Sequence, residues 1–162
     1  MSDQSPDPAP PTEVPLARTL RLQKLVNRVV RGLLATPVLS RGIGRRLVTI
    51  YVIGRTSGRR FTIPVAYTAT GDGLLVGSPF PWARNLRTGE PVDVRYLGRR
   101  RRAEVEVFTE QDDVVRLYAT IARGNRNFAR FNGIRVDAAG EPDSQDLHRA
   151  WVGGARVIRL RP

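Results

Sequence analysis

The sequence contains no cysteine and only one histidine, His148. Without cysteine the chain can form neither a disulfide framework nor a thiolate metal site, and it offers no thiol nucleophile. A histidine-built metal site or a serine–histidine triad would depend on His148 alone, which stands in a polar segment, residues 144–149, with no nucleophile motif beside it. We therefore expect no metal site and no catalytic triad, and we interpret His148 as a surface residue.

Long apolar runs and the common nucleotide-binding motifs are also missing. No stretch approaches the run of about 18 apolar residues that spans a membrane, and residues 1–15 lack the basic start and the apolar core of a signal peptide. Neither Gly-x-x-x-x-Gly-Lys-Ser/Thr nor Gly-x-Gly-x-x-Gly occurs, and no spacing of carboxylates indicates glycosidase chemistry. We expect a protein that is cytoplasmic, or peripheral at the inner face of the membrane.

Arginine, by contrast, is abundant. The 162 residues include 27 basic and 15 acidic ones, which gives a formal net charge of +12, and every basic residue except Lys24 is arginine. The length fits one domain with a sizeable core. A field this positive favours anionic partners: a polyanionic cofactor, an acidic membrane surface or nucleic acid.

Residues 1–15 are polar and rich in proline, which predicts a disordered tail ahead of a single domain at residues 16–162. The first element of that domain is predicted to be an amphipathic helix at residues 16–35. The basic residues opposite its apolar face are Arg21, Lys24, Arg28 and Arg31. Two interpretations stay open: the helix covers the core with its basic side in solvent, or it lies on an anionic membrane with its apolar face down.

Alternating and β-branched runs predict six strands, at residues 47–53, 61–68, 74–77, 92–97, 100–108 and 155–160. Thr109 and Asp112 have the spacing of a capping box and predict a helix that ends near residue 122. Residues 124–134 are expected to be irregular, and residues 137–145 to form a polar loop. Strands joined mostly by hairpins, with a few peripheral helices, fit a mainly β (α+β) fold, a six-stranded antiparallel barrel.

The most distinctive stretch lies between the first two predicted strands and reads Gly54-Arg55-Thr56-Ser57-Gly58-Arg59-Arg60. Glycines let backbone N–H groups approach a ligand closely, and successive N–H groups in a tight turn bind anions. Arginine adds a fork of donors that suits phosphate or carboxylate. The stretch therefore fits two interpretations, an anion cradle or a solvated hairpin tip.

A second stretch follows the third predicted strand and reads Gly77-Ser78-Pro79-Phe80-Pro81-Trp82-Ala83-Arg84-Asn85-Leu86-Arg87. With it, the chain resembles the deazaflavin-dependent nitroreductase and quinone reductase family, whose members are split β-barrels of the FMN-binding-like superfamily. The shared features are a glycine–arginine–x–serine–glycine hairpin, Thr62-x-Pro64, Ser78 at a strand end, and Pro81-Trp82 followed by Asn85-Leu86. The resemblance covers residues 47–107 and the last predicted strand.

The resemblance implies an oxidoreductase that uses the deazaflavin coenzyme F-420. A hydride would pass from the reduced coenzyme to a small organic acceptor such as a quinone, so the cofactor and not a catalytic side chain carries the chemistry. FMN is the alternative cofactor. The coenzyme has a phosphodiester and an oligoglutamate tail, and a basic mouth over an apolar barrel complements such an anion.

The resemblance also assigns roles to individual residues. Those expected to contact the cofactor are Arg55, Ser57 and Gly58 at its phosphate or tail, Arg60 and Thr62 on the strand beneath, Pro64 near the ring system, and Trp82, Asn85 and Leu86 in the wall beyond the third strand. Ser78 is expected to contact the acceptor. Trp82 fits equally well as a core anchor, and Asn85 as a turn or cap residue.

Three departures from the family pattern touch the cofactor site. Thr56 stands where the family usually has lysine, Phe61 stands where it often has arginine, and the loop at residues 78–82 is shorter than the usual glycine-rich version. A second interpretation is therefore a family member with altered cofactor use, or one that binds the cofactor without catalysis. Phe128 and Phe131 stand where the family has a tyrosine-rich acceptor lid.

A rival function of another class rests on arginine. Residues 99–102 are four arginines in a predicted hairpin, and in residues 123–135 arginine alternates with asparagine and phenylalanine. Such mixtures bind single-stranded nucleic acid on some small barrels. No known nucleic-acid motif accompanies them, so a nucleic-acid partner is the weaker expectation. The run of four also fits a solvated strand edge that blocks edge-to-edge pairing.

Overall fold

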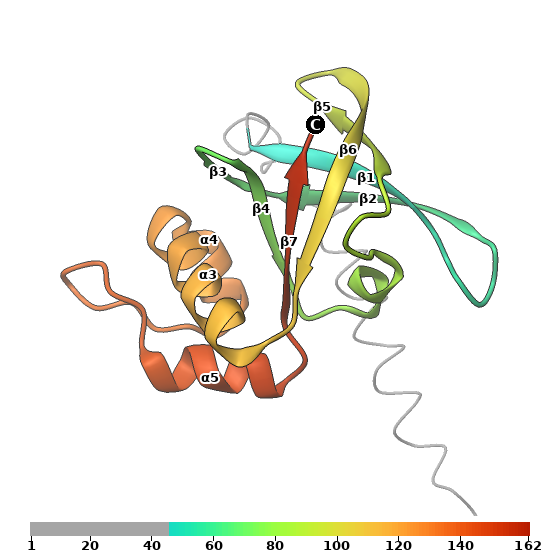
Figure 1. Ribbon diagram of the computed structural model, residues 1–162. Helices are drawn as coiled ribbons and strands as arrows, with labels where there is room; N and C mark the ends of the chain where they lie inside the picture. Colours follow the sequence, from blue (N-terminus) through green and yellow to red (C-terminus); the bar gives the residue numbers. More distant parts are fainter. Residues whose placement is uncertain (1–45) are drawn as a thin grey trace, which may run out of the picture. The chain divides into compact units, whose positions relative to one another are not determined.

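The computed structural model describes residues 46–162. The predicted tail and the predicted helix at residues 16–35 lie outside the described residues, so both stay predictions. The described elements, in chain order, are β1 (Leu47–Ile53), β2 (Arg60–Ala66), β3 (Thr68–Thr70), β4 (Gly73–Ser78), the 3-10 helix η1 (Pro81–Asn85), β5 (Val92–Tyr96), β6 (Arg99–Phe108), α3 (Gln111–Gly124), α4 (Arg126–Phe131), α5 (Ser144–Val152) and β7 (Arg156–Arg161) (Figure 1).

The strands form one antiparallel sheet in the order β2-β1-β5-β6-β7-β4-β3. Its two edge strands, β2 and β3, are consecutive in the chain and are separated by Tyr67 alone. One residue cannot cross the width of a flat seven-stranded sheet, so the sheet must curl until its edges approach each other (Figure 1). The predicted mainly β, antiparallel split-barrel fold is therefore confirmed, as a half-barrel.

Residues 46–162 contain seven strands where six are predicted, because the run at residues 61–68 divides at Tyr67. The Tyr67 N–H donates to the carbonyl of Arg46 (3.0 Å), and the next residue, Thr68, already pairs with Leu75 on β4. The buried Tyr67 ring meets the Tyr96 ring edge-on, with centroids 5.5 Å apart. Burial is the main cause that raises the pKa of Tyr67, and the neighbouring Tyr96 raises it further.

Apolar side chains at alternate positions of the strands fill the inside of the half-barrel. On β1 every second residue, Val48, Ile50 and Val52, is buried in a cluster that also takes side chains from β4, β5, β6 and β7. One buried face and one exposed face are what a period of two residues predicts. Each fully buried aliphatic side chain of this cluster contributes roughly 1.5–3 kcal/mol to folding.

Strands β4 and β7 are buried on both faces because helices lie against their outer side. Leu75 and Val157 belong to a second cluster with α3, whereas their neighbours Val76 and Ile158 belong to the cluster inside the barrel. Helix α3 lies against β4 and β7, and α4 and α5 pack on α3 (Figure 1). This double burial explains why these two strands have consecutive apolar residues instead of strict alternation.

The helices depart from the sequence predictions in three places. Helix α3 has Glu110 as its N-cap, with no side-chain hydrogen bond to the cap, so the predicted capping box is wrong. Residues 124–134, predicted to be irregular, contain α4, whose N-cap Asn125 accepts a hydrogen bond from the Phe128 N–H (3.0 Å). No helix is predicted at residues 144–152, where the structure has α5.

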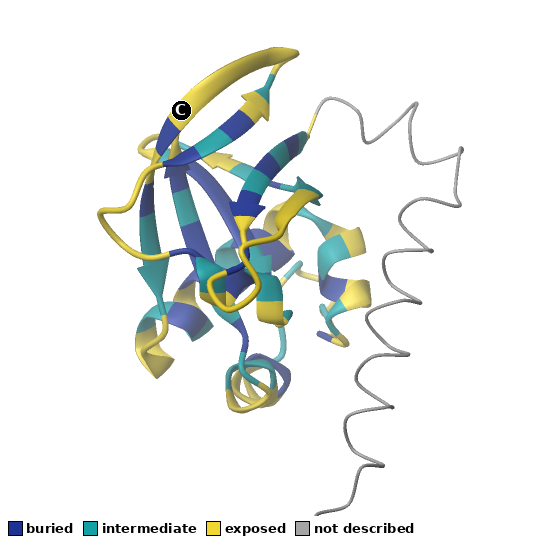
Figure 2. Cartoon of the chain, turned by 90° about the vertical axis from the view of Figure 1, so that its right-hand side faces the viewer, coloured by how far each residue is buried: buried dark blue, intermediate teal, exposed yellow. Residues whose placement is uncertain are grey.

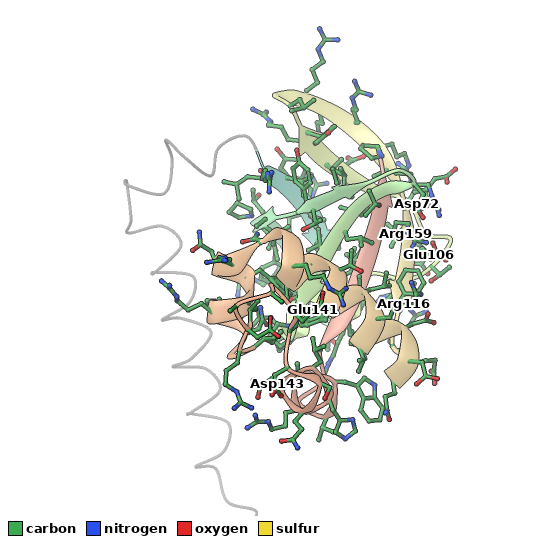
Figure 3. The ribbon with its side chains drawn as sticks, turned by 90° about the vertical axis from the view of Figure 1, so that its left-hand side faces the viewer. Asp72, Glu106, Arg116, Glu141, Asp143 and Arg159 are labelled. Atoms are coloured by element: carbon green, nitrogen blue, oxygen red, sulfur yellow. The ribbon has the colours of Figure 1, made fainter. Side chains whose placement is uncertain are left out.

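Charged side chains fix the turn between β3 and β4 (Figure 3). Arg159 on β7 lies 3.1 Å from the carboxylate of Asp72 in that turn and 2.7 Å from Glu106 on β6. The hydroxyl of Thr70 donates to Asp72 at 2.7 Å. This hydrogen bond, together with Arg159, holds the pKa of Asp72 below its ordinary value. The turn is therefore tied to the middle of the sheet by charge as well as by backbone pairing.

Replacing Tyr118 by phenylalanine is expected to raise the free energy of unfolding by about 1 kcal/mol. The Tyr118 side chain on α3 is fully buried beside Phe128, and its hydroxyl finds no hydrogen-bond partner within residues 46–162. Burial also raises its pKa. A buried hydroxyl without a partner costs its desolvation, and phenylalanine removes that cost without changing the packing. Urea unfolding checks this; a less stable variant would mean that the hydroxyl is hydrogen-bonded in solution.

Candidate functional site

The arginine-rich tip at residues 54–59 closes on itself. The Gly58 N–H donates to the Gly54 carbonyl (2.7 Å), and the Gly54 N–H donates to the Arg59 carbonyl (2.8 Å). Gly58 has φ +62, and a Cβ at Gly54 would lie 2.7 Å from the Ser57 hydroxyl. The backbone therefore favours glycine at Gly58, whereas a side chain at Gly54 would displace the Ser57 hydroxyl.

Loop closure leaves few backbone donors for a ligand. The N–H of Arg59 donates to the Ser57 hydroxyl (3.3 Å), and the N–H of Arg55 is also bonded. Within the described residues, the backbone N–H groups of Thr56 and Ser57 are the two in this loop that make no hydrogen bond. The anion-binding capacity of the tip thus rests on two N–H groups and on side chains.

Arg55 joins the tip to the Pro/Trp segment. Its backbone N–H donates to Asn85 Oδ1 (3.0 Å) and its Nε to the Asn85 carbonyl (3.2 Å), while its Nη2 donates to Glu90 Oε2 (2.6 Å). Asn85 in turn donates from Nδ2 to the Trp82 carbonyl (3.0 Å). The two stretches that carry the family resemblance are therefore bound to each other.

The helix η1 anchors that segment on the barrel. Ala83 and Leu86 are buried in the inner cluster, and Trp82 is half-buried against the same cluster. Asn85 ends η1 and holds the turn through its two side-chain hydrogen bonds. Trp82 as a core anchor and Asn85 as a turn residue both agree with these contacts, and neither role excludes contact with a cofactor.

Ser78 is the last residue of β4, and residues on either side of it, Gly77 and Phe80, meet the aromatic residues of α4. It is buried, and its Oγ accepts a hydrogen bond from the Phe80 N–H (3.2 Å). The Phe80 and Phe131 rings lie 6.1 Å apart. A Cβ at Gly77 would come within 2.6 Å of Phe128, so a glycine there lets α4 approach the strand. The two phenylalanines at the expected lid positions thus reach the segment that contains Ser78.

The remaining predicted residues face elsewhere. On β2, Ile63 and Val65 pack on the inner cluster, so Arg60, Thr62 and Pro64 point to the outer face of the sheet. Ser78 follows the inward alternation of Leu74 and Val76 on β4. The structure therefore brings Arg55 together with the Pro/Trp segment, whereas Ser78 faces the inside of the barrel and its neighbours Gly77 and Phe80 meet α4. Arg60 borders the tip in the chain, and Thr62 and Pro64 lie further along the outer face of β2.

Several cations near the site have no acidic partner. Within the described residues, no carboxylate pairs with Arg59, Arg60, Arg84 or Arg87. Glu90 is the acidic residue among these cations, and its ion pair with Arg55 offsets part of the positive charge there. Nothing in the spacing of the sequence indicates this pairing, because Glu90 lies in a turn 35 residues further along the chain.

Two open surface depressions lie outside the predicted cofactor residues. The first, of about 380 Å³, is lined by Arg84, Thr109, Trp151, Val152, Gly154, Ala155 and Arg156. The second, of about 480 Å³, is lined by Thr88, Gly89, Pro91, Glu104, Val105, Glu106 and Arg161. Trp151 reaches the first depression because it lies on α5. The start of α5 is marked by its N-cap Asp143, whose side chain accepts a hydrogen bond from the Asp146 N–H (3.0 Å).

Two kinds of site are not found in residues 46–162. These residues contain no group of histidine, cysteine and carboxylate side chains that could hold a metal ion. None of their helices is long and apolar enough to cross a membrane.

No protein-family model and no curated protein matches the chain. Among solved structures, the chain is similar to the crystal structure of HutZ, the heme storage protein from Vibrio cholerae, with 16% sequence identity and a TM-score of 0.46. The similarity covers 73% of this chain and 82% of that one. At so low an identity and TM-score it assigns neither a cofactor nor an activity, and the half-barrel is established by the strand order.

Proposed function

We propose that the protein is an oxidoreductase of the deazaflavin-dependent nitroreductase type. It binds coenzyme F-420 at the 54–60 tip and the 78–86 segment and serves hydride transfer from the reduced coenzyme to a small organic acceptor such as a quinone. The observation that carries the proposal is the pair of hydrogen bonds from Arg55 to Asn85, at 3.0 and 3.2 Å, which joins the two stretches of the family resemblance.

The tip fits the anionic end of the coenzyme. The N–H groups of Thr56 and Ser57 are free to donate within the described structure, and the exposed Arg59 and Arg60 have no acidic partner there. Arg55 retains its Nη1 donors, since its bonds to protein use Nε and Nη2. Phosphate and carboxylate oxygens are the acceptors that suit such an array.

The aromatic part of the coenzyme and the acceptor require a surface beside the tip. Trp82 supplies a half-buried ring next to Asn85, and Phe131 meets Phe80 at the other side of the segment. The Ser78 hydroxyl accepts from the Phe80 N–H, which leaves its own proton to donate, but the side chain is buried, so contact with an acceptor oxygen would require the segment to open around it. The coenzyme supplies the hydride, and these residues bind, orient and limit water access.

A fluorescence titration with F-420, with FMN as the matched control, tests the cofactor. We expect saturable binding of F-420 that weakens as salt is added, because exposed charge pairs are screened. Binding of FMN without binding of F-420 would show that the cofactor assignment is wrong. Copurifying RNA, visible as a high ratio of absorbance at 260 to 280 nm, would favour the nucleic-acid alternative.

A turnover assay separates the enzyme from a protein that only binds the coenzyme. Reduced F-420 is mixed with the protein and a soluble quinone, and the return of the oxidised absorbance is followed. We expect turnover to require both protein and quinone. Saturable binding without turnover would leave the non-catalytic alternative, which the departures at Thr56 and Phe61 also allow.

A further inference from the structure

The turn between β5 and β6 exposes a leucine in an unfavourable backbone conformation. Leu97 has φ +47 and is 69% exposed, and Gly98 follows with φ +76. Within residues 46–162, Leu97 is the one non-glycine residue with positive φ. Two-residue hairpin turns of this kind favour asparagine, aspartate or glycine at both positions, because a side chain at positive φ is strained. Turn geometry therefore does not explain the leucine.

Arginines surround this turn on both faces of the hairpin. The arginine collar, as we call them, consists of Arg95, Arg99, Arg100, Arg101 and Arg102. Strand β7 pairs with β6 only from Glu104 onward, so residues 99–103 pair with β5 alone and leave one edge of β6 open. Figure 2 shows the turn and the adjoining part of β6 as exposed, whereas Tyr96 at the end of β5 is half-buried. An open edge lined by arginine is protected against strand pairing, which accounts for the collar but not for Leu97.

Contacts with β1 and Tyr67 hold the hairpin that carries these side chains. Tyr96, the last residue before the turn, contacts the buried Tyr67. The guanidinium of Arg100 lies 4.7 Å from the centre of the Tyr51 ring, and its weak ion pair with Asp93 measures 3.4 Å. Within the described residues, Arg100 is the one collar arginine with an acidic partner. The other four are free to bind an external anion.

We propose that the Leu97 turn docks on an anionic lipid surface. Leu97 enters the boundary between headgroups and acyl chains, and the arginine collar binds the lipid phosphates around it. An exposed apolar tip within a ring of cations binds an anionic membrane well, because the free energies of apolar burial and of attraction to anionic headgroups add up. Nucleic acid would use the collar but would gain nothing from a leucine at the tip.

The docking surface and the proposed cofactor site lie at opposite ends of β1. In the antiparallel register, Thr49 pairs with Arg95 and Tyr51 with Asp93, so the β5–β6 turn lies beyond the start of β1. The tip at residues 54–59 follows the other end of that strand. A docked hairpin therefore leaves the tip accessible, and the proposal does not depend on the cofactor assignment.

Replacing Leu97 by asparagine tests the apolar part of the surface. Asparagine tolerates positive φ, so the variant keeps or gains stability, while its affinity for phosphatidylglycerol-containing vesicles falls roughly tenfold through the lost burial of one leucine. The control is Val152→Asn, since Val152 is 67% exposed but lies at the end of α5. All variants retain residues 1–45, so any membrane affinity of that segment is common to them. Unchanged vesicle binding in Leu97→Asn would overturn the proposal.

The double variant Arg99→Gln/Arg101→Gln tests the charge. Each cation near an anionic surface contributes about 1 kcal/mol, so the vesicle affinity is expected to fall roughly thirtyfold. The control, Arg126→Gln/Arg130→Gln on α4, changes the net charge equally and is expected to have little effect. Equal losses in both variants would indicate a diffuse field and overturn the proposal. So would binding to phosphatidylcholine alone, or single-stranded RNA binding that exceeds vesicle binding and is unchanged by Leu97→Asn.

Discussion

Replacing Asp146 by alanine is expected to lower the free energy of unfolding by about 3 kcal/mol. The Asp146 side chain is only 2% exposed, and its Oδ2 accepts from both the backbone N–H of Arg135 (3.0 Å) and the Nε of Arg135 (2.8 Å). Oδ1 pairs with Arg149 one turn along α5. The carboxylate therefore holds the segment before α5 to the first turn of the helix.

The size of the loss follows from which partners remain behind. Arg135 and Arg149 are 69% and 68% exposed, so removing the carboxylate leaves no buried charge without a partner. The loss consists of charged hydrogen bonds, each of the order of 1.5–3 kcal/mol, and of an acidic group in the first turn of a helix. Partial compensation by water limits the total. An Asp146→Asn variant keeps the shape and one acceptor, so its loss should be smaller.

Asp113 provides a matched control. It lies in the first turn of α3 and pairs with Arg116 three residues later, as Asp146 does with Arg149, but its side chain is 43% exposed. An exposed pair of this kind contributes at most about 1 kcal/mol, so Asp113→Ala should be nearly neutral. Urea unfolding followed by tryptophan fluorescence measures both variants, with Trp151 in α5 as a local reporter. Equal losses at the two positions would show that burial of Asp146 adds nothing.

Most of the fold could be predicted because strand patterns are local. The alternation of Val48, Ile50 and Val52 marks β1 in the sequence and is buried as expected in the structure. The division at Tyr67 could not be predicted, because it arises when the curled sheet passes the chain from one edge to the other. Helix α5 could have been found, since Asp143 and Asp146 form its cap, Leu147 and Trp151 have helical spacing, and Gly153 follows.

The candidate site could be predicted only in part. That the 54–60 tip and the Pro/Trp segment belong together follows from the family resemblance, and Arg55 and Asn85 are in contact. The partnership of Arg55 with Glu90 joins three loops, and no local pattern contains it. The outward direction of Thr62 and Pro64 depends on which face of β2 the barrel buries, and the apolar Ile63 and Val65, which alternate with them, already indicate that face.

Replacing Arg55 by alanine is expected to weaken F-420 binding roughly 10- to 150-fold, the equivalent of about 1.5–3 kcal/mol for hydrogen bonds to a charged group. The control is Arg100→Ala, because Arg100 lies on the β5–β6 hairpin, beyond the other end of β1. It should leave the coenzyme affinity unchanged. Equal losses in the two variants would mean that the coenzyme responds to the overall positive field and not to a specific cradle.

The loss at Arg55 by itself does not separate binding from positioning, because Arg55 also holds Asn85. Glu90→Gln separates them. The carboxylate lies 2.6 Å from Arg55 Nη2 and competes with any anionic ligand for the guanidinium, while glutamine keeps a neutral acceptor there. If Arg55 binds the coenzyme directly, the variant should bind F-420 up to about fivefold more tightly, since an exposed ion pair is equivalent to at most about 1 kcal/mol. If Arg55 acts only by holding the turn, the affinity in the same titration should stay constant or fall.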